Sequence, residues 1–296
     1  MVRFSGNAAA AIAASIRRSA QQSEPAETQQ VQQADNSSRD EEIEKILDNM
    51  EIKRKDFLES DQKTRFSSAE WLKYIQKETA SIIGCGGIGS WTSLLLARTG
   101  IGGIYSYDFD IIESQNMAGQ LFRLQDLGKH KVDAMKEIIK EYVPTLKGAF
   151  LSEPYNNQPL SRITITALDS IAVRKVVFEQ YCEQYKNYHD KSKCLFIDGR
   201  MSAEAFQVFI FRLSQEDKIK EYEQSLFEDS KATGNVCSYK ATSYVGAMIG
   251  AYITALVKEH LHFSSDEYFA ENIPYFHEID TSFGIKIKTQ STWKFQ

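Results

Sequence analysis

The feature that most constrains this chain is a cluster of glycines between two apolar segments. The short apolar run ASIIG ends in Gly84, and Gly86, Gly87 and Gly89 follow it to give the spacing G-x-G-G-x-G. In a strand–turn–helix unit, the first glycine of G-x-G-x-x-G allows the tight turn, the second lets a phosphate approach the backbone, and the third lets the helix pack closely on the strand. The amides that begin the helix then face an anion. The pattern predicts a nucleotide-binding unit; three glycines that serve only packing are the alternative.

Strand-like and helix-like patterns alternate along the rest of the chain. This alternation predicts a Rossmann-like α/β fold, a doubly wound, mostly parallel sheet with helices on both faces. The expected strands are ASIIG, GGIYSYDFD, ITITALDS, CLFIDGR, EAFQVFIFRL and the strand-like end PYFHEIDTSFGIKIK. The expected helices follow the glycine cluster and then cover residues 128–142, 171–188 and 239–261.

The chain divides into three predicted parts. Residues 1–40 are rich in Ala, Gln and Ser and carry no aromatic residue after Phe4, so we expect a flexible tail. Its Arg-containing start, which lacks acids, leaves a transit peptide as an alternative. Residues 41–77 are expected to form a helical segment, and residues 78–296 the main domain.

Within that domain, we expect residues 78–175 to form the nucleotide-binding half. Residues 176–296 are expected to form the half that contacts the substrate and a second subunit.

Composition excludes several classes of protein. The net charge of −5 gives no reason to expect a protein that binds nucleic acid. Glycines interrupt the uncharged stretches 79–97 and 241–257, so we expect buried elements and no membrane span. The four cysteines form no C-x-x-C pair, which suits free thiols in a reducing compartment and predicts a cytoplasmic protein.

An acid follows the second predicted strand. Asp108 lies 24 positions after Gly84, where a ribose-binding carboxylate is expected in a Rossmann unit. This arrangement suits any adenine nucleotide, and it does not separate ATP from NAD.

Three later motifs favour ATP over NAD, because they resemble the motifs of a known family. They are DFDIIESQNMAGQLF from Asp108, GKHKV from Gly128, and TALDSIAVR from Thr166. With the glycine cluster, they resemble in order and spacing the ThiF/MoeB/HesA family of ubiquitin-activating-enzyme-like adenylyltransferases, in particular its compact bacterial or phage-type members. The match is good over residues 78–174 and looser as far as Asp280.

The resemblance implies an ATP- and magnesium-dependent enzyme that adenylylates the C-terminal carboxylate of a small ubiquitin-like protein or peptide and releases pyrophosphate. It also implies a homodimer. Asp108 and Asp110 would hold the nucleotide, with Asp108 on the ribose. Asn116 and Gln120 would lie beside the phosphates, unless Asn116 is a simple turn residue.

The same resemblance assigns the charged groups. Lys131 would neutralise phosphate charge, although an isolated lysine on a helix is usually a solvated surface residue. Asp169 would bind magnesium, although it could instead cap the helix that begins near Ile171. Arg174 matches the arginine that follows this turn in the family, and we expect a structural role for it.

The chain departs from the family pattern at Gly119, where members usually carry an arginine that helps to hold the ATP phosphates. Arg65 is the candidate for the upstream arginine that reaches a neighbouring subunit's ATP, with a surface residue as the alternative. Cys237 precedes the long apolar helix and is a candidate thioester nucleophile, with an unreactive cysteine as the alternative. Asp198 and Arg200, at a strand end, are expected to bind the incoming peptide.

The adenylyltransferase hypothesis leaves two alternatives open. The Gly-rich loop and Asp108 also allow an NAD-dependent oxidoreductase, although no dyad for hydride chemistry stands out. The Gly119 departure allows a scaffold that binds nucleotide without catalysis.

Overall fold

The computed structural model of this chain describes residues 45, 68–226, 242–263 and 273–290. The described residues from 68 onward belong to one compact unit, Lys63–Gln296. The expected tail, most of the expected helical segment, Arg65 and Cys237 lie outside the described residues.

The unit is built on one sheet in the order β3-β2-β1-β4-β5-β6-β7-β8. The first five strands in this order are parallel, and the last three pair antiparallel. The strands are β1 (Thr79–Ile83), β2 (Gly103–Tyr107), β3 (Lys147–Leu151), β4 (Ile163–Thr166), β5 (Leu195–Met201), β6 (Ala205–Arg212), β7 (Phe276–Asp280) and β8 (Lys286–Gln290). The predicted doubly wound, mostly parallel sheet is confirmed.

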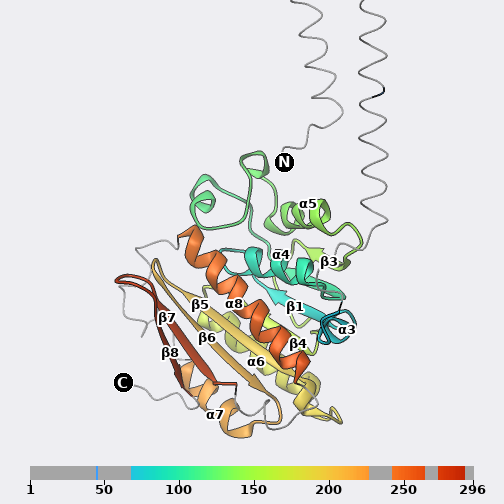
Figure 1. Ribbon diagram of the computed structural model, residues 1–296, viewed down its shortest axis with the longest axis vertical. Helices are drawn as coiled ribbons and strands as arrows, with labels where there is room; N and C mark the ends of the chain where they lie inside the picture. The colour runs from blue at the N-terminus through green and yellow to red at the C-terminus, as the bar shows by residue number, and fades with distance from the viewer. Residues whose placement is uncertain (1–44, 46–67, 227–241, 264–272, 291–296) are drawn as a thin grey trace, which may run out of the picture. The chain divides into compact units, whose positions relative to one another are not determined.

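Helices cover both faces of the sheet (Figure 1). One face packs on α3 (Leu72–Ile75), α4 (Gly89–Thr99), α5 (Lys131–Tyr142) and α8 (Ser243–His262). The other face packs on α6 (Ile171–Tyr185) and α7 (Glu216–Ser225). The long helix α8 lies over β5 and β6, runs roughly along them in Figure 1, and also packs on α4.

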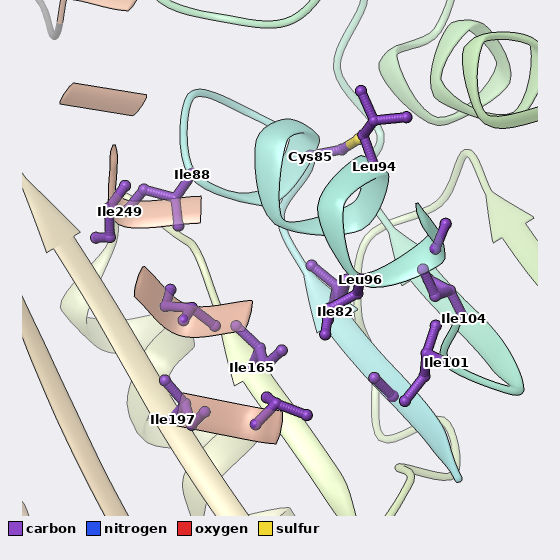
Figure 2. Packing of buried hydrophobic residues seen from close by; sticks show 14 of the residues in the cluster. Ile82, Cys85, Ile88, Leu94, Leu96, Ile101, Ile104, Ile165, Ile197 and Ile249 are labelled. Carbon is purple, nitrogen blue, oxygen red and sulfur yellow. The ribbon is translucent and has the colours of Figure 1, made fainter. Parts of the chain in front are cut away.

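The two faces have different cores because side chains alternate along each strand. The face under α4 and α8 is aliphatic, with Ile82, Ile165, Ile197 and Ile249 among its buried residues (Figure 2). The face under α6 and α7 is aromatic. Its buried residues include Phe178, Tyr181, Phe196, Phe209, Phe211 and Tyr222. The aromatic rings meet mostly edge to face or tilted, as for Phe178 and Tyr222 with ring centroids 5.0 Å apart.

Some elements differ from the sequence expectation. The edge strand β3 was not predicted, because its sequence KGAFL has an apolar run too short to be distinctive. The amphipathic helix α7 was not predicted either. Helix α5 begins at Lys131 rather than at Gly128, because Gly128 has a φ of +80° and His130 is still extended. Within the part of the chain that the structure describes, no helix has both the length and the apolarity needed to cross a bilayer.

Candidate functional site at the carboxyl edge of the sheet

The Gly-rich loop joins β1 to α4 with little space at two of its glycines. Gly84 has a φ of +95°, and a Cβ there would lie 2.5 Å from the Ala167 carbonyl oxygen. A Cβ on Gly89 would overlap the Gly84 carbonyl and would lie 3.4 Å from Ile82. These two positions require glycine for the turn and for the contact between helix and strand.

Gly86 is different, because space is open beside it. The nearest atom to a Cβ on Gly86 would be the Gln120 Nε2, at 3.8 Å. The Gln120 Oε1 is buried and has no hydrogen-bond partner. The absence of a side chain at Gly86 is therefore not explained by packing, and it leaves the backbone open to a ligand next to a side-chain amide.

The other wall of the loop is the start of α8. A Cβ on Gly246 would lie 2.8 Å from the Gly87 carbonyl oxygen and 2.9 Å from the Gly119 carbonyl oxygen. Trp91, on α4, also donates from its indole nitrogen to the Gly119 oxygen over 3.3 Å. Gly119 is thus a buried backbone position between two helices, and its carbonyl has a partner.

Asp108 follows β2 and is turned toward the Gly-rich loop. Its Oδ2 accepts from the Cys85 amide at 2.6 Å, and its Oδ1 accepts from the Asp110 amide at 2.9 Å. Burial raises the pKa of the Asp108 carboxyl, although the two amides and the Lys131 charge act in the opposite direction. Asp108 therefore fixes the shape of the loop in addition to any contact with a ribose.

Lys131 is the first residue of α5 and is buried, with 6% of its surface exposed. Its ammonium Nζ lies 2.5 Å from the Asp110 Oδ2, and its amide donates to the Asp110 carbonyl oxygen. The alternative of a solvated surface lysine is therefore wrong, because a side chain this buried is shielded from water. The cation is held beside an exposed carboxylate at the edge of the Gly-rich loop.

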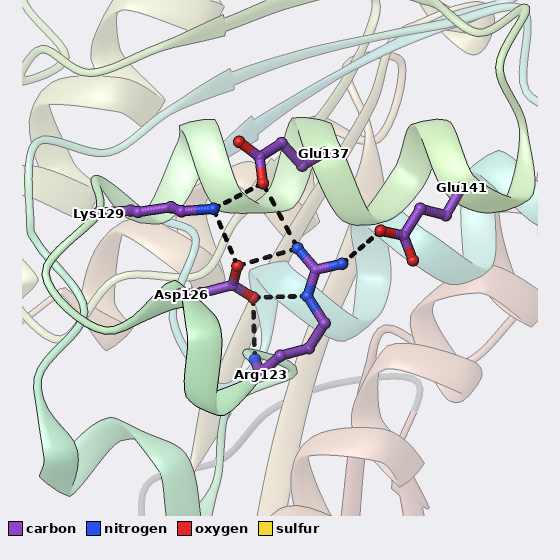
Figure 3. A network of polar contacts seen from close by, with 5 residues as sticks. All are labelled: Arg123, Asp126, Lys129, Glu137 and Glu141. Atoms are coloured by element: carbon purple, nitrogen blue, oxygen red, sulfur yellow. Dashed lines mark hydrogen bonds and ion pairs between the residues drawn. The ribbon is translucent and has the colours of Figure 1, made fainter. Parts of the chain in front are cut away.

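A polar network holds the connection between β2 and α5 (Figure 3). Asp126, which is fully buried, accepts from the Arg123 guanidinium at 2.8 and 2.9 Å and lies 3.3 Å from the Lys129 ammonium. Arg123 and Lys129 also pair with Glu141 and Glu137 on α5. Burial opposes ionisation of Asp126, but the hydrogen bonds from Arg123 outweigh it and lower the pKa of Asp126. The network fixes this connection to α5.

Asn116 lies in the same connection, inside a short 3-10 helix over Ser114–Ala118. Its side-chain Oδ1 accepts from the Glu113 amide at 2.8 Å, while the Glu113 side chain accepts from the Asn116 amide. Asn116 thus has the structural role of a turn residue. Its expected position beside the phosphates stays a prediction.

Asp169 lies just beyond the carboxyl end of β4 and is exposed. The cap of α6 is its neighbour Ser170, whose Oγ accepts from the Val173 amide at 3.3 Å. The alternative that Asp169 caps this helix is therefore wrong. Among the described residues, no group of three or more His, Cys, Asp or Glu side chains could by itself hold a metal ion. A magnesium ion that takes its other ligands from phosphates and water needs only one or two carboxylates, so Asp169 fits that ion.

Asp198 does not lie where a peptide could reach it. It is fully buried, its Oδ1 accepts from the Thr166 hydroxyl at 2.6 Å and pairs with Arg174, and its Oδ2 pairs with the Arg200 Nε at 2.8 Å. Arg200 also lies over the Phe209 ring at 4.4 Å. The expectation that Asp198 and Arg200 bind the peptide is wrong, because both are occupied in a buried network beneath the site. Arg174 has the expected structural role.

The cysteines offer no accessible thiolate in the described part of the chain. Cys85, Cys182 and Cys194 are free thiols there, and Cys85 is fully buried inside the Gly-rich loop. Burial strongly raises the pKa of the Cys85 thiol, so it packs as a small hydrophobic residue. The site therefore rests on backbone, Gln120, Lys131 and carboxylates.

Sequence reasoning missed two contributors to this site. Gly246 begins the contact of α8 with the loop, and it stands four residues before Gly250, whose Cβ would lie 2.7 Å from the Trp91 Cβ. This spacing of small residues on a helix is visible in the sequence and signals a close helix contact. Asp126 was missed although its partners Arg123 and Lys129 lie only three residues away on either side, because nothing in the sequence shows that Asp126 is fully buried.

A comparison with known families decides the relationship. The model of the ThiF family matches residues 60–291. The chain belongs to the ThiF family.

Two curated relatives show how far the likeness extends. The ubiquitin-like modifier-activating enzyme 5 of Arabidopsis thaliana is 37% identical over 70 residues, which are 24% of this chain and 16% of the relative. The tRNA threonylcarbamoyladenosine dehydratase of Bacillus subtilis is 31% identical over 103 residues, which are 34% of this chain and 41% of the relative. The chain thus matches less than half the length of these relatives.

Solved structures of MccB from E. coli share the fold. The structure with ATP has a TM-score of 0.54 at 19% identity, and covers 76% of this chain and 66% of that one. The structure with MccA has a TM-score of 0.57 at 18% identity, and covers 81% of this chain and 74% of that one. At this identity the likeness shows the fold alone.

Proposed function

We propose that this chain binds ATP with magnesium at the Gly-rich loop and adenylylates a carboxylate. The observation that carries the proposal is the open backbone at Gly86, flanked by a buried lysine after β2 and an exposed aspartate after β4. The carboxyl ends of neighbouring parallel strands meet at one edge, which is where such sheets bind nucleotides.

In the proposed reaction, a carboxylate oxygen attacks the α-phosphorus of ATP. The bond from that phosphorus to the oxygen bridging the α- and β-phosphates breaks, and pyrophosphate leaves with its electron pair. The protein's part is to position the groups and neutralise charge. Magnesium, when bound with ATP, would neutralise negative charge on the phosphate oxygens. Asp169 is the side chain that would hold the ion. The amides at the start of α4 face the same anion.

Lys131 is poised for a phosphate because it already faces an anionic partner. Its ammonium lies 2.5 Å from the exposed carboxylate of Asp110. A phosphate oxygen can replace that carboxylate without any new burial of the cation. We propose that Lys131 exchanges Asp110 for the nucleotide, which leaves Asp110 beside Asp108 at the sugar.

The acceptor is proposed to be the C-terminal carboxylate of a ubiquitin-like protein or a peptide. Three exposed apolar residues support a macromolecular partner at this edge: Phe283 is 87% exposed, Ile285 67% and Ile287 64%. Exposed apolar residues gathered in one place usually mark a contact with another molecule. The names of the relatives agree, because one is a ubiquitin-like modifier-activating enzyme and MccB has been crystallised with MccA.

We also propose a homodimer, in which the partner subunit supplies a cation for the phosphates in place of the arginine absent at Gly119. The arginine and lysine nearest that position in the chain, Arg123 and Lys129, are already paired with Asp126, Glu137 and Glu141. Light scattering after size-exclusion chromatography would test it, and a monomeric mass would contradict it.

The decisive experiment is calorimetric titration of the full chain with ATP and magnesium, and separately with NAD. Asp169→Ala is expected to abolish the magnesium dependence of ATP binding, and Lys131→Ala to weaken ATP binding at least about tenfold, the value of one lost charge contact. The matched controls are Asp217→Ala and Lys140→Ala, which change exposed residues on α7 and α5 and should leave binding unchanged.

Other outcomes would point elsewhere. Tight binding of NAD without ATP would indicate a redox enzyme. ATP binding without exchange of labelled pyrophosphate, in the presence of a peptide ending in a free carboxylate, would favour a scaffold. Unchanged magnesium dependence in Asp169→Ala would remove Asp169 from the site.

A further inference from the structure

A cavity of about 420 Å³ opens at the opposite edge of the sheet from the Gly-rich loop. Its polar lining includes residues that lie just before the parallel strands: Glu78 before β1, Arg162 before β4, and Lys193 two residues before β5. Pockets of roughly 300–1,000 Å³ are typical of small-molecule sites. None of these residues takes part in the proposed nucleotide site.

The inner wall of the cavity is His260, near the end of α8 and 1% exposed. Its Nδ1 accepts from the Arg212 Nε at 3.1 Å. Burial, followed by the Arg212 charge, lowers the pKa of His260 to about 3, so the imidazole is neutral near pH 7. His260 therefore adds no positive charge itself, and its ring lies between the cavity and the buried Arg212 guanidinium.

Arg212 forms no direct ion pair in the described part of the chain, although the charge of Asp190 acts on it over a longer distance. It is 7% exposed, and its Nη2 is buried with no hydrogen-bond partner. Among the residues that the structure describes, no carboxylate lies within ion-pair distance of it. A buried charge without an opposite charge is unfavourable, which makes the adjacent space attractive to an anion.

The acids of the cavity are already occupied. Glu78 lies 2.7 Å from the Arg162 guanidinium, and Asp190 lies 3.1 Å from the Lys193 ammonium. Lys77 lines the cavity and is exposed to solvent. Lys77 and Arg212 are therefore two positive charges that these acids do not neutralise.

We propose that this cavity binds a small organic anion through one carboxylate or phosphate group. Lys77 holds the anion at the mouth, and Arg212 attracts it from behind the His260 ring. Tyr74 and Leu261, which also line the cavity, provide apolar contact for the body of the ligand. The site is distinct from the Gly-rich loop, and helix α8 connects the two, since Gly246 contacts that loop and His260 this cavity.

The test uses the full chain, titrated with inorganic phosphate and with acetate by calorimetry in the presence of ATP and magnesium. Lys77→Gln is expected to weaken binding of the preferred anion at least tenfold. Lys73→Gln is the matched control, since Lys73 lies on the same helix, stacks on the outer Tyr74 ring at 5.0 Å and does not line the cavity. Arg212→Met should have the same effect as Lys77→Gln, and circular dichroism checks that it folds.

The results separate cleanly. A response to phosphate alone identifies a phosphate ester as the ligand class, and a response to acetate alone identifies a carboxylic acid. No binding of either anion overturns the proposal, as does equal weakening by Lys73→Gln and Lys77→Gln. Loss of anion binding in Lys131→Ala but not in Lys77→Gln also overturns it, because the anion would then occupy the Gly-rich loop. If Arg212→Met fails to fold, Lys77→Gln decides alone.

Discussion

The two edges of the sheet differ in whether their buried charged side chains have partners of opposite charge. At the carboxyl edge, the charged groups beneath the Gly-rich loop are paired. Asp198 accepts a hydrogen bond from Thr166 and forms ion pairs with Arg174 and Arg200. At the amino edge, Arg212 is also buried but has a neutral histidine as its hydrogen-bond partner. A balanced network supports a site by staying fixed, whereas an unbalanced cation attracts an ion from outside.

The largest expected difference between the edges comes from removing one charge at each. Asp198→Asn leaves the buried Arg174 and the partly buried Arg200 without their acid and should reduce the free energy of unfolding by about 3–5 kcal/mol. Arg212→Met removes a buried charge that has no acid partner, so stability should change by less than about 1 kcal/mol or rise. Urea unfolding at pH 7 measures both. Equal losses would erase the comparison.

The backbone of the carboxyl edge can be tested with two glycines. Gly84→Ala should destabilise the protein by about 3 kcal/mol, because of the positive φ and the contact with the Ala167 oxygen. Gly86→Ala has room for its methyl group, so stability should change by less than about 1 kcal/mol. ATP should nevertheless bind at least about tenfold more weakly to Gly86→Ala, because the methyl group occupies the approach of the phosphate. Normal ATP binding by this folded variant would remove the loop from the nucleotide site.

The amino edge should make stability depend on pH. The pKa of His260 is lowered from 6.5 to about 3 in the folded protein, so between these values the unfolded chain binds a proton that the folded chain does not. Stability from this residue is therefore complete above pH 6.5 and falls by about 1.4 kcal/mol per unit as the pH decreases below it, or about 2 kcal/mol by pH 5. Urea unfolding from pH 7.5 to 5 measures the slope. The same slope in His260→Gln would show that His260 is not its source.

The smallest expected effect on stability is a difference between two neighbouring residues, Ser170 with a structural role and Asp169 with a proposed role in binding magnesium. Ser170→Ala removes the cap of α6 and should cost about 1 kcal/mol. Asp169→Ala should change stability by less than about 0.5 kcal/mol, because Asp169 is exposed. Thermal unfolding of the two variants gives this ranking. A greater loss in Asp169→Ala would assign it a structural role instead.

Much of the fold was predictable because its signals are local. The glycine spacing, the apolar runs and the alternation of strand and helix lie within short windows and predicted the sheet, while the resemblance of the ordered motifs predicted the family; both are confirmed. The edge strand β3 was not predicted because none of its five residues is buried, so its sequence lacks a buried pattern. The start of α5 shifted to Lys131 because Gly128 adopts a positive φ that composition alone does not reveal.

The candidate site was less predictable, because residue type does not show what a side chain contacts. Asp169 and Asp198 both end strands in the sequence, yet the first is exposed and the second is fully buried among arginines. The difference arises because β5 continues past Asp198 to Met201, and Arg174, on α6, reaches Asp198 in the middle of this strand. No spacing in the sequence encodes that contact.

The sequence by itself thus determined where the backbone turns and which strands are buried, because backbone sterics and side-chain periodicity act over a few residues. Only the tertiary structure decided which charges are paired. Asp198 finds its partners, and Arg212 meets a neutral His260, through elements that are far apart in the chain. The free energy of a charge depends on burial and on its nearest partner, and both are set by packing.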